Sequence, residues 1–178
     1  DSGLIDLTPG TLTIGQAALT ISSSNVSKIY DAGLSAIGTA VVSGGTLFGS
    51  DTLSGGNFAI TYKNVGTGKR VTVNGVSVSD GNGGGNYAVT YADNTSSTIT
   101  ALGVTVDATG TNRVYDGGTT DTVALASAGV LSGDTVNFTG TGNFADKNVG
   151  TAKAVGVSGI TASGTDAGNY SYNTTANT

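Results

Sequence analysis

The chain has 178 residues, of which 37% are hydrophobic and only 11% charged, and its formal net charge is −5. An acidic chain with few lysines and arginines cannot neutralise a phosphate backbone, so we expect no nucleic-acid partner. No apolar run approaches the roughly 20 residues that cross a bilayer, so we expect no membrane insertion. The lack of cysteine excludes disulfides and thiolate metal sites.

Catalytic residue types are scarce. The chain has no histidine, cysteine or glutamate, which removes the usual general bases, thiol nucleophiles and transition-metal ligands. A serine or threonine nucleophile would need a lysine or aspartate to activate it, and no motif places a hydroxyl group beside one. We therefore expect a protein that is not an enzyme.

The first residues match a segment in the middle of the chain. The sequence TLTIGQAALTI at 11–21 resembles SSTITALGVTV at 96–106. We therefore expect residues 1–18 to be the end of a preceding repeat plus a linker. The chain would then be a monomeric fragment of a longer protein.

Beyond this linker, apolar residues alternate with small or polar ones, which is the pattern of half-buried β-strands. In chain order, the alternating residues are Phe58, Ile60 and Tyr62, then Val71 and Val73, then Tyr87, Val89 and Tyr91, and then Val104 and Val106. Clusters of Gly, Asn and Asp at 79–86 and 164–169 predict turns. Residues 122–134 are the only stretch for which we expect a short helical turn.

The chain also repeats itself. Residues 63–76 and 147–160 are identical at nine of fourteen positions, and the sequence FGSDTL at 48–53 corresponds to LSGDTV at 131–136. Internal repeats of this kind indicate a modular array. We expect two units, at 19–102 and 103–178, in an elongated arrangement. Short strands at short intervals predict an all-β fold with at most a short helical turn per unit, each unit a small antiparallel β-sandwich or β-grasp-like module.

The repeated motifs carry a family resemblance. In the second unit they are Tyr115-Asp116-Gly117, then Gly133 to Val136, then Lys147 to Lys153, and then Asp166 to Tyr170. Their order resembles the YDG-type repeat of large bacterial adhesins of the filamentous-haemagglutinin class, which are exported by two-partner secretion. The first unit departs from it at Ala32, which replaces the glycine. The resemblance implies a tandem module linked to adhesion and biofilm formation, without catalytic residues.

Two loops carry the hard oxygen ligands that calcium prefers. The candidate ligands are Asp80, Asn82 and Asn86 in the first loop and Asp166 and Asn169 in the second. Neither loop has the spacing of an EF-hand or of a calcium-binding nonapeptide, and the same residue types are ordinary in tight turns. We expect no cofactor, with bound calcium as the alternative.

A lysine recurs at one position of the two units, as Lys69 and Lys153. The stretch KNVGTGKR at 63–70 lacks the first glycine and the hydroxyl residue of a phosphate-binding loop, so we expect a turn that leads into the strand Val71–Val73. An exposed lysine at the start of a strand discourages edge pairing. The alternative for Lys69 and Lys153 is an intramolecular crosslink to an Asn or Asp side chain.

The phrases KIYDAG at 28–33 and RVYDGG at 113–118 place Tyr30 and Tyr115 at the same point of each unit. We expect both tyrosines to lie in the core and Asp31 and Asp116 to accept hydrogen bonds within the following turn. Because residue 32 of the first unit is an alanine, we expect no positive φ at this position. The recurring aromatic pairs, which are Tyr30/Tyr115, Tyr87/Tyr170 and Phe58/Phe144, would fill the core; the alternative is that they stack on sugars.

These features predict a structural stalk or spacer. We expect repeats of a secreted or surface-attached bacterial adhesin, associated with the outer membrane, that support adhesion or biofilm formation. Their partners would be neighbouring repeats of the same chain. The alternative is a carbohydrate-binding module that recognises an exopolysaccharide or a host glycan.

Overall fold

The computed structural model describes residue 10 and residues 12–178. The prediction of a linker at 1–18 therefore falls partly on residues 1–9 and 11, which lie outside the described residues. The described chain is built of strands and one 3-10 turn, η1 (Ala167–Asn169). The all-β prediction is confirmed.

The first part of the chain forms two sheets. One has the strand order β3-β1-β6 and the other the order β2-β7-β5-β4. Their strands are β1 (Ala17–Ser23), β2 (Ser27–Ile29), β3 (Ala40–Gly45), β4 (Thr52–Ile60), β5 (Gly66–Ser79), β6 (Tyr87–Tyr91) and β7 (Asn94–Thr100).

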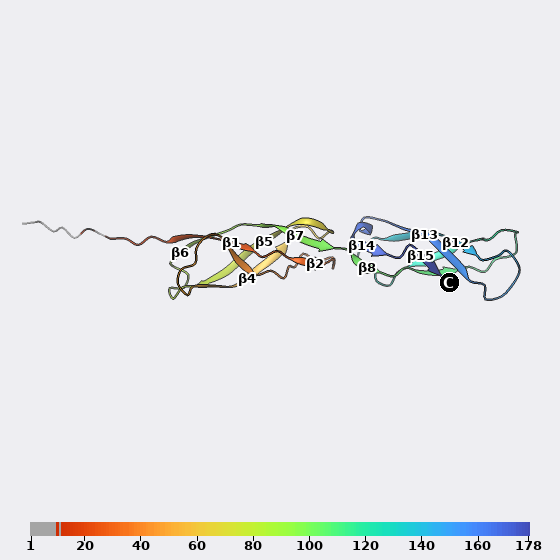
Figure 1. Cartoon of the computed structure of the whole chain (residues 1–178), viewed down its shortest axis with the longest axis horizontal. Helices are drawn as coiled ribbons and strands as arrows, with labels where there is room; N and C mark the ends of the chain where they lie inside the picture. Colours follow the sequence, from red (N-terminus) through yellow and green to blue (C-terminus); the bar gives the residue numbers. More distant parts are fainter. Residues whose placement is uncertain (1–9, 11) are drawn as a thin grey trace, which may run out of the picture.

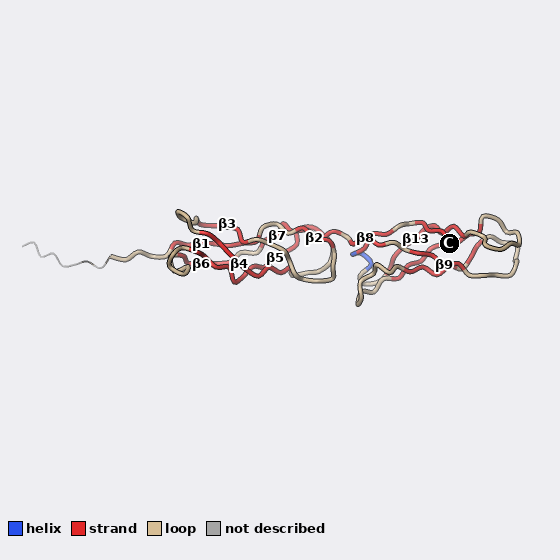
Figure 2. Tube along the Cα trace, turned by 90° about the horizontal axis from the view of Figure 1, so that it is seen from below, coloured by secondary structure: helices blue, strands red, loops and turns tan. Residues whose placement is uncertain are grey.

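The second part forms three smaller sheets, with the orders β14-β8, β11-β9 and β10-β12-β13-β15. Their strands are β8 (Leu102–Val104), β9 (Asp107–Gly110), β10 (Thr120–Asp121), β11 (Val123–Ala126), β12 (Asn137–Phe144), β13 (Val155–Ser163), β14 (Tyr170–Tyr172) and β15 (Thr175–Asn177). The two units follow one another along the long axis of the molecule, and only Ala101 separates β7 from β8 (Figure 1). The turned view in Figure 2 shows the same slender outline.

Three strand pairs are parallel, so the prediction of antiparallel modules is wrong for them. β1 runs parallel to β6, β8 to β14 and β2 to β7, whereas β4, β5, β12 and β13 form antiparallel ladders. A strand that is half-buried alternates in the same way whichever direction its neighbour runs. The alternation in the sequence therefore predicted the strands but not their directions.

The expected helical turn at 122–134 is also wrong. Residues Val123–Ala126 form β11, whose side chains alternate in burial, and Val123 and Leu125 pack on the core of the second unit. Pairing with β9 and burial at every second residue favour a strand over a helical turn. The only helical segment among the described residues is the 3-10 turn at Ala167–Asn169.

Three hydrophobic clusters follow one another along the chain. One is formed around Leu19, Ile21 and Tyr87 in the first unit, and another around Val106, Val155, Val157 and Ile160 in the second. The central cluster is shared: Tyr170 of the second unit packs with buried residues of the first. The two units therefore do not keep wholly separate cores.

Two positions that were predicted to face the core, Tyr62 and Tyr91, are exposed, and Tyr91 is 43% exposed at the end of β6. Tyr62 follows the end of β4 and is 66% exposed, whereas Ile60, two residues earlier, is 1% exposed. The alternation breaks where the strand ends, because the chain turns away from the sheet at this point.

Candidate functional site: the junction between the units

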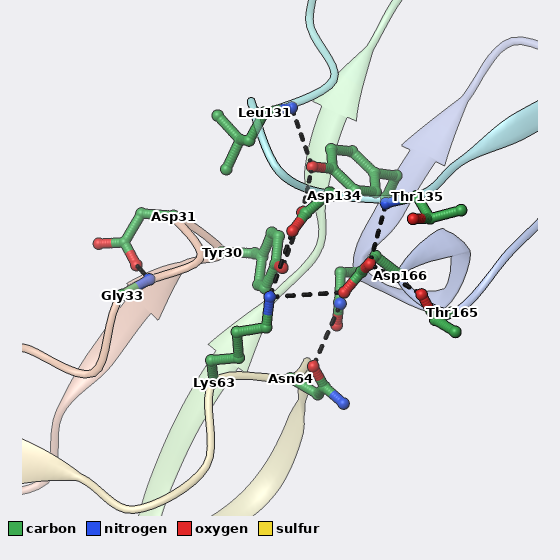
Figure 3. A network of polar contacts seen from close by, with 12 residues as sticks. Tyr30, Asp31, Gly33, Lys63, Asn64, Leu131, Asp134, Thr135, Thr165 and Asp166 are labelled. Atoms are coloured by element: carbon green, nitrogen blue, oxygen red, sulfur yellow. Dashed lines mark hydrogen bonds and ion pairs between the residues drawn. The ribbon is translucent and has the colours of Figure 1, made fainter.

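A buried carboxylate lies where the two units meet. Oδ2 of Asp134 accepts hydrogen bonds from the hydroxyl groups of Tyr170 at 2.6 Å and Tyr30 at 2.8 Å (Figure 3). Oδ1 accepts a third from the Lys63 ammonium group at 3.2 Å. The Asp134 side chain is only 2% exposed. Two donors from the first unit and one from the second thus converge on one carboxylate.

The loop that carries Asp134 is fixed by its own unit. The backbone N–H of Asp134 donates to the carbonyl of Leu131 at 3.1 Å, and the Leu131 N–H donates to the Tyr170 hydroxyl group at 3.1 Å. Gly133 has a φ of 93°, a conformation that glycine adopts without strain. The second unit therefore presents Asp134 and Tyr170 together to its neighbour.

Lys63 extends the charged contact to a second aspartate. Its ammonium nitrogen lies 3.4 Å from Oδ1 of Asp166 and 5.8 Å from the centre of the Tyr30 ring. Asp166 is held in turn by the Thr135 N–H, which donates to its Oδ2 at 3.0 Å. One cation of the first unit thus bridges two loops of the second.

The two tyrosine rings provide the apolar part of the junction. Tyr30 and Tyr170 meet edge to face, with ring centres 5.6 Å apart and planes at 73°. They are 2% and 6% exposed. Buried aromatic pairs of this geometry contribute about 0.5–1.5 kcal/mol beyond the area that they bury.

Asparagine side chains complete the contact. Oδ1 of Asn169 accepts the Val65 N–H at 3.0 Å, and the Asn169 amide group donates to Oδ1 of Asn64 at 3.3 Å. Asn169 is buried, and its hydrogen bonds cross from one unit to the other. This candidate calcium ligand therefore acts as an inter-unit hydrogen-bonding group.

These contacts shift the pKa values of the ionisable side chains at the junction. Burial raises the pKa of Tyr170 to about 12, with the hydrogen bond to Asp134 adding to the effect. Burial and the same carboxylate also raise the pKa of Tyr30. Burial opposes the ionisation of Asp134, but hydrogen bonds from Tyr170, Tyr30 and Lys63 outweigh it and lower its pKa. Asp134 is thus held as a carboxylate between two neutral phenols.

The outer end of the first unit repeats half of this arrangement. The Tyr87 hydroxyl group donates to Oδ2 of Asp51 at 2.6 Å and accepts the Phe48 N–H at 2.9 Å. Tyr87, Asp51 and Phe48 correspond in the repeat to Tyr170, Asp134 and Leu131. Each unit therefore builds the same Asp–Tyr pair at the same end.

The outer end of the second unit requires a correction. Tyr115 was expected in the core as the counterpart of Tyr30, but it is 58% exposed. Val149, the counterpart of Val65, is 88% exposed, and Lys147 and Asn148 are exposed as well. Tyr30 owes its burial to the second unit packed against it. Tyr115 has no such neighbour among the described residues.

The aspartate after each tyrosine shapes the turn. Oδ1 of Asp31 accepts the Gly33 N–H at 2.9 Å, and Oδ1 of Asp116 accepts the Gly118 N–H at 2.8 Å. The residue three positions before each aspartate, Lys28 or Arg113, forms an ion pair with it. The ion pair with Lys28 and the Gly33 N–H lower the pKa of Asp31. In both units, the Tyr-Asp motif therefore begins a turn that is held by a backbone hydrogen bond and an ion pair to the aspartate.

The prediction for Ala32 is wrong, because its φ is 59°. Lys28 Nζ contacts both the Asp31 carboxylate, at 2.7 Å, and the Gly33 carbonyl, at 3.2 Å. These contacts lie on both sides of Ala32 and fix its backbone in the left-handed region. Gly117 has a φ of 81° at the same place in the second unit, where the conformation carries no Cβ penalty.

The remaining calcium candidates form a closed loop. Asp80 accepts the backbone N–H groups of Asn82, Gly84 and Asn86 at 2.8, 2.7 and 3.0 Å. These bonds, the one from Asn86 first, lower the pKa of Asp80. The Asn82 amide group donates to Oδ1 of Asn86 at 3.1 Å. The oxygens of this loop thus face N–H donors, which favours its role as a turn.

The two recurring lysines have different contacts. Lys153 forms an ion pair with Asp146 and donates to the carbonyl of Asn148 at 2.8 Å. Lys69 lies over the Tyr62 ring, 5.8 Å from its centre. The aromatic pair Phe58/Phe144 packs beside cores, Phe58 on the central cluster and Phe144 on that of the second unit.

The sequence pattern missed Lys63 and Asp134 as functional residues. Both belong to motifs that recur in the two units, KNVGT and SDT or GDT. That recurrence was the available signal, but it did not show that one motif of the first unit meets the other motif of the second.

The described residues contain no group of three or more acidic, histidine or cysteine side chains that could hold a metal ion. Within the same residues, no helix has the length and apolar character needed to cross a membrane. The arrangement at the junction joins two units through hydrogen bonds, an ion pair and aromatic packing.

The fold and the junction define a tandem β-repeat protein, in which motifs at one end of a unit bind motifs at the opposite end of the next. The model of the YDG domain family matches the chain twice, at residues 15–96 and 100–178. The chain therefore belongs to the YDG domain family and contains two tandem copies of the domain. A search of curated proteins and a search of solved structures found no match.

Proposed function

We propose that this chain is a stalk segment of a secreted or surface-attached bacterial adhesin of the two-partner-secretion class, which supports adhesion or biofilm formation. Its repeats set the distance between the cell and a binding part elsewhere in the protein, and they carry out no catalysis. The single observation that carries this proposal is the polar junction centred on Asp134, because it joins consecutive units end to end.

The junction suits a spacer for a physical reason. Tyr30, Lys63 and Asn64 of the first unit bind Asp134, Asp166 and Asn169 of the second, so the contact limits bending between the units. Five of these six residues recur at the corresponding position of the other unit, and Asp166 is the exception, because its counterpart is Gly83. An array built from such units grows in length with each added unit, as in other repeat proteins.

Glycan binding is the weaker candidate. Three of the recurring aromatic residues that could stack on sugars, Tyr30, Tyr87 and Tyr170, are buried. A sugar ring stacks on an exposed aromatic face, so these residues support the spacer instead. Tyr115 is the member of these pairs whose exposure suits stacking.

Small-angle X-ray scattering on proteins with two, four and six units tests the spacer function. The maximum dimension is expected to rise by a constant increment for each added pair of units. A compact particle whose dimension grows with the cube root of mass would contradict the proposal. A glycan array that gave saturable binding, lost in Tyr115→Ala, would favour the carbohydrate-binding alternative.

A further inference from the structure

Lys63 and Asp134 place an amine beside a carboxyl group at the centre of the junction (Figure 3). The Lys63 nitrogen lies 3.2 Å from Oδ1, an atom bonded directly to the carboxyl carbon Cγ of Asp134. The two residues are 71 positions apart in the chain and belong to different units. A bond between this nitrogen and Cγ would release water and join the two units covalently.

The other oxygen of the same carboxyl group is held by two hydroxyl groups. Tyr170 and Tyr30 both donate to Oδ2 of Asp134, at 2.6 and 2.8 Å. When an amine attacks a carboxyl carbon, negative charge develops on the oxygen that remains in the product. Donors that already surround this oxygen stabilise the transition state. The two phenols therefore have the arrangement of an oxyanion hole around Oδ2, while Lys63 contacts Oδ1.

A second carboxylate lies next to the same nitrogen. Oδ1 of Asp166 is 3.4 Å from Nζ of Lys63, and the Thr135 N–H donates to its Oδ2 at 3.0 Å. A nitrogen that forms an amide must lose protons, so a proton acceptor beside it assists the reaction. Asp166 occupies that position and takes no part in the new bond.

The ion pair is the resting form of the two groups. Burial is the largest influence on the pKa of Asp134 and acts to raise it, although the three hydrogen bonds that it accepts lower it overall. Contacts with Tyr30 and Asp134 raise the pKa of Lys63. The reactive neutral pair is reached by moving one proton from Lys63 to Asp134. Because the Asp134 side chain is only 2% exposed, burial reduces the cost of this transfer.

We propose that Lys63 and Asp134 react with each other after the chain folds and form an intramolecular isopeptide bond. The fold holds the two groups together, so they react as an intramolecular pair and not as a bimolecular one. Tyr30 and Tyr170 stabilise the oxyanion, and Asp166 moves a proton. The reaction occurs once in each chain, without turnover, and the inference is independent of the proposed adhesin function.

The reaction proceeds through a tetrahedral intermediate. One ammonium proton moves to Oδ1 of Asp134, which leaves a neutral amine beside a neutral acid. The lone pair of the amine attacks Cγ, and the electron pair of the Cγ–Oδ2 double bond moves onto Oδ2. Asp166 accepts a second proton from the nitrogen and passes it to Oδ1. Oδ1 then leaves as water, the double bond to Oδ2 forms again, and the nitrogen keeps one hydrogen as an amide N–H.

Proximity alone does not distinguish this pair from others. Lys28 and Asp31 approach more closely, to 2.7 Å, but the Asp31 side chain is 58% exposed. The Gly33 N–H donates to the oxygen of Asp31 that already faces Lys28. Within the described part of the chain, no hydroxyl group donates to Asp31. Burial and the two phenol donors therefore single out Asp134, and Lys28 with Asp31 serves as an internal reference that should not react.

Intact mass spectrometry of the native chain tests the bond and needs no variant. The mass is expected to be lower than that of the sequence by one water molecule. Lys63→Met is expected to have its full sequence mass. Lys69→Met is the matched control and is expected to keep the loss, because Lys69 lies over the Tyr62 ring and forms no ion pair in the described structure.

Peptide mapping locates the bond. Trypsin does not cleave after an acylated lysine, so a branched peptide is expected in which residues 29–69 are joined to residues 114–147. This product distinguishes the crosslink from the cyclisation of an aspartate with its own backbone, which also releases one water molecule. Peptides that end at an unmodified Lys28 are expected as well.

The rate of bond formation tests the assisting residues. Chain purified in urea from insoluble aggregates is unreacted, because the junction forms only on folding, and dilution of the urea starts the reaction. Tyr170→Phe is expected to slow bond formation by about a hundredfold, since one oxyanion donor is lost. Asp166→Asn is also expected to slow it, because an amide does not accept the proton. Circular dichroism of the same samples reports folding separately from the reaction.

A native chain that keeps its full sequence mass after prolonged incubation in the folded state would overturn the inference. Loss of water without the branched peptide would overturn it too, because the bond would then lie elsewhere. An unchanged rate in folded Tyr170→Phe and Asp166→Asn would contradict the assisted reaction.

Discussion

The hydroxyl group of Tyr30 lies 2.8 Å from the carboxylate of Asp134, a residue 104 positions further along the chain. The tyrosine opens the YDG motif of the first unit, and the aspartate belongs to a different motif of the second. The family motifs therefore act between consecutive units as well as within each unit.

Tyr30→Phe tests this bond, because it removes the hydroxyl group and keeps the ring. We expect the free energy of unfolding to fall by about 1–2 kcal/mol, since a hydrogen bond to a buried charged group is lost. Chemical denaturation with urea measures the change. Tyr115→Phe is the matched control and is expected to change the value by less than about 0.5 kcal/mol, because Tyr115 is exposed. Equal losses in the two variants would contradict the junction.

Lys63→Met tests the ion pair with Asp134 and Asp166. The variant leaves the 2% exposed Asp134 side chain without its cation, so we expect its pKa to rise and the junction to open more readily. Carboxyl chemical shifts followed by NMR across acidic pH report the pKa. Limited proteolysis near Ala101 reports the opening. Lys147→Met, at the corresponding exposed position, is expected to leave both measurements at their native values, and a similar change there would argue against the contact.

The stability of the chain should fall at both extremes of pH. Tyr170 has a pKa of about 12 in the folded chain and an ordinary value of 10.0, so its contribution is complete below pH 10 and is lost as the pH rises from 10 through 12. The pKa of Asp134 is lowered below its ordinary 3.8, so its contribution is complete above that value and is lost as the pH falls below it.

Urea unfolding from pH 2 to pH 12 measures this profile. Tyr170→Phe removes one titrating phenol of the junction and is expected to flatten the alkaline fall. Asp134→Asn should flatten the acidic one. An unchanged profile in both variants would show that other groups govern the pH dependence.

Ala32 has a φ of 59° and therefore limits what can replace it. Ala32→Val is expected to lower the free energy of unfolding by about 1–3 kcal/mol, because a β-branched residue is strained at positive φ. Ala32→Gly relieves the strain of the left-handed conformation, which costs about 1–2 kcal/mol, but adds freedom to the unfolded chain. We expect a net gain of up to about 1 kcal/mol, measured by thermal and urea unfolding. A valine variant as stable as the glycine variant would contradict the assigned conformation.

The sequence predicted the parts of the fold that repeat and alternate. Tyr87 and Tyr170, which the repeat identifies as equivalent, are both buried as expected, and alternation located parts of β4, β5, β6 and β8. The burial of Tyr30 was predicted without its cause, since nothing local to Tyr30 reveals that Tyr170 covers it. The same motif therefore gave the wrong environment for Tyr115. Its sequence motif matches that of Tyr30, but its side chain is exposed.

Other misses have local causes. Alternation has the same period in parallel and antiparallel strands, so the pairing of β1 with β6 was not readable. The conformation of Ala32 is imposed by Asp31, Gly33 and Lys28, and it overrides the preference of an alanine. Lys63 was passed over because the sequence KNVGT is identical in both units, while only one copy contacts a neighbour.

The continuity of β7 and β8 has a mechanical consequence. A tensile force along the long axis enters the second unit through Ala101, and within the first unit it acts on a strand hydrogen-bonded on both sides, to β2 and to β5. The force runs along these strands, so their hydrogen bonds are loaded together in shear instead of opening one after another. We expect a single high unfolding force for the first unit, with resistance that depends on the rate of pulling.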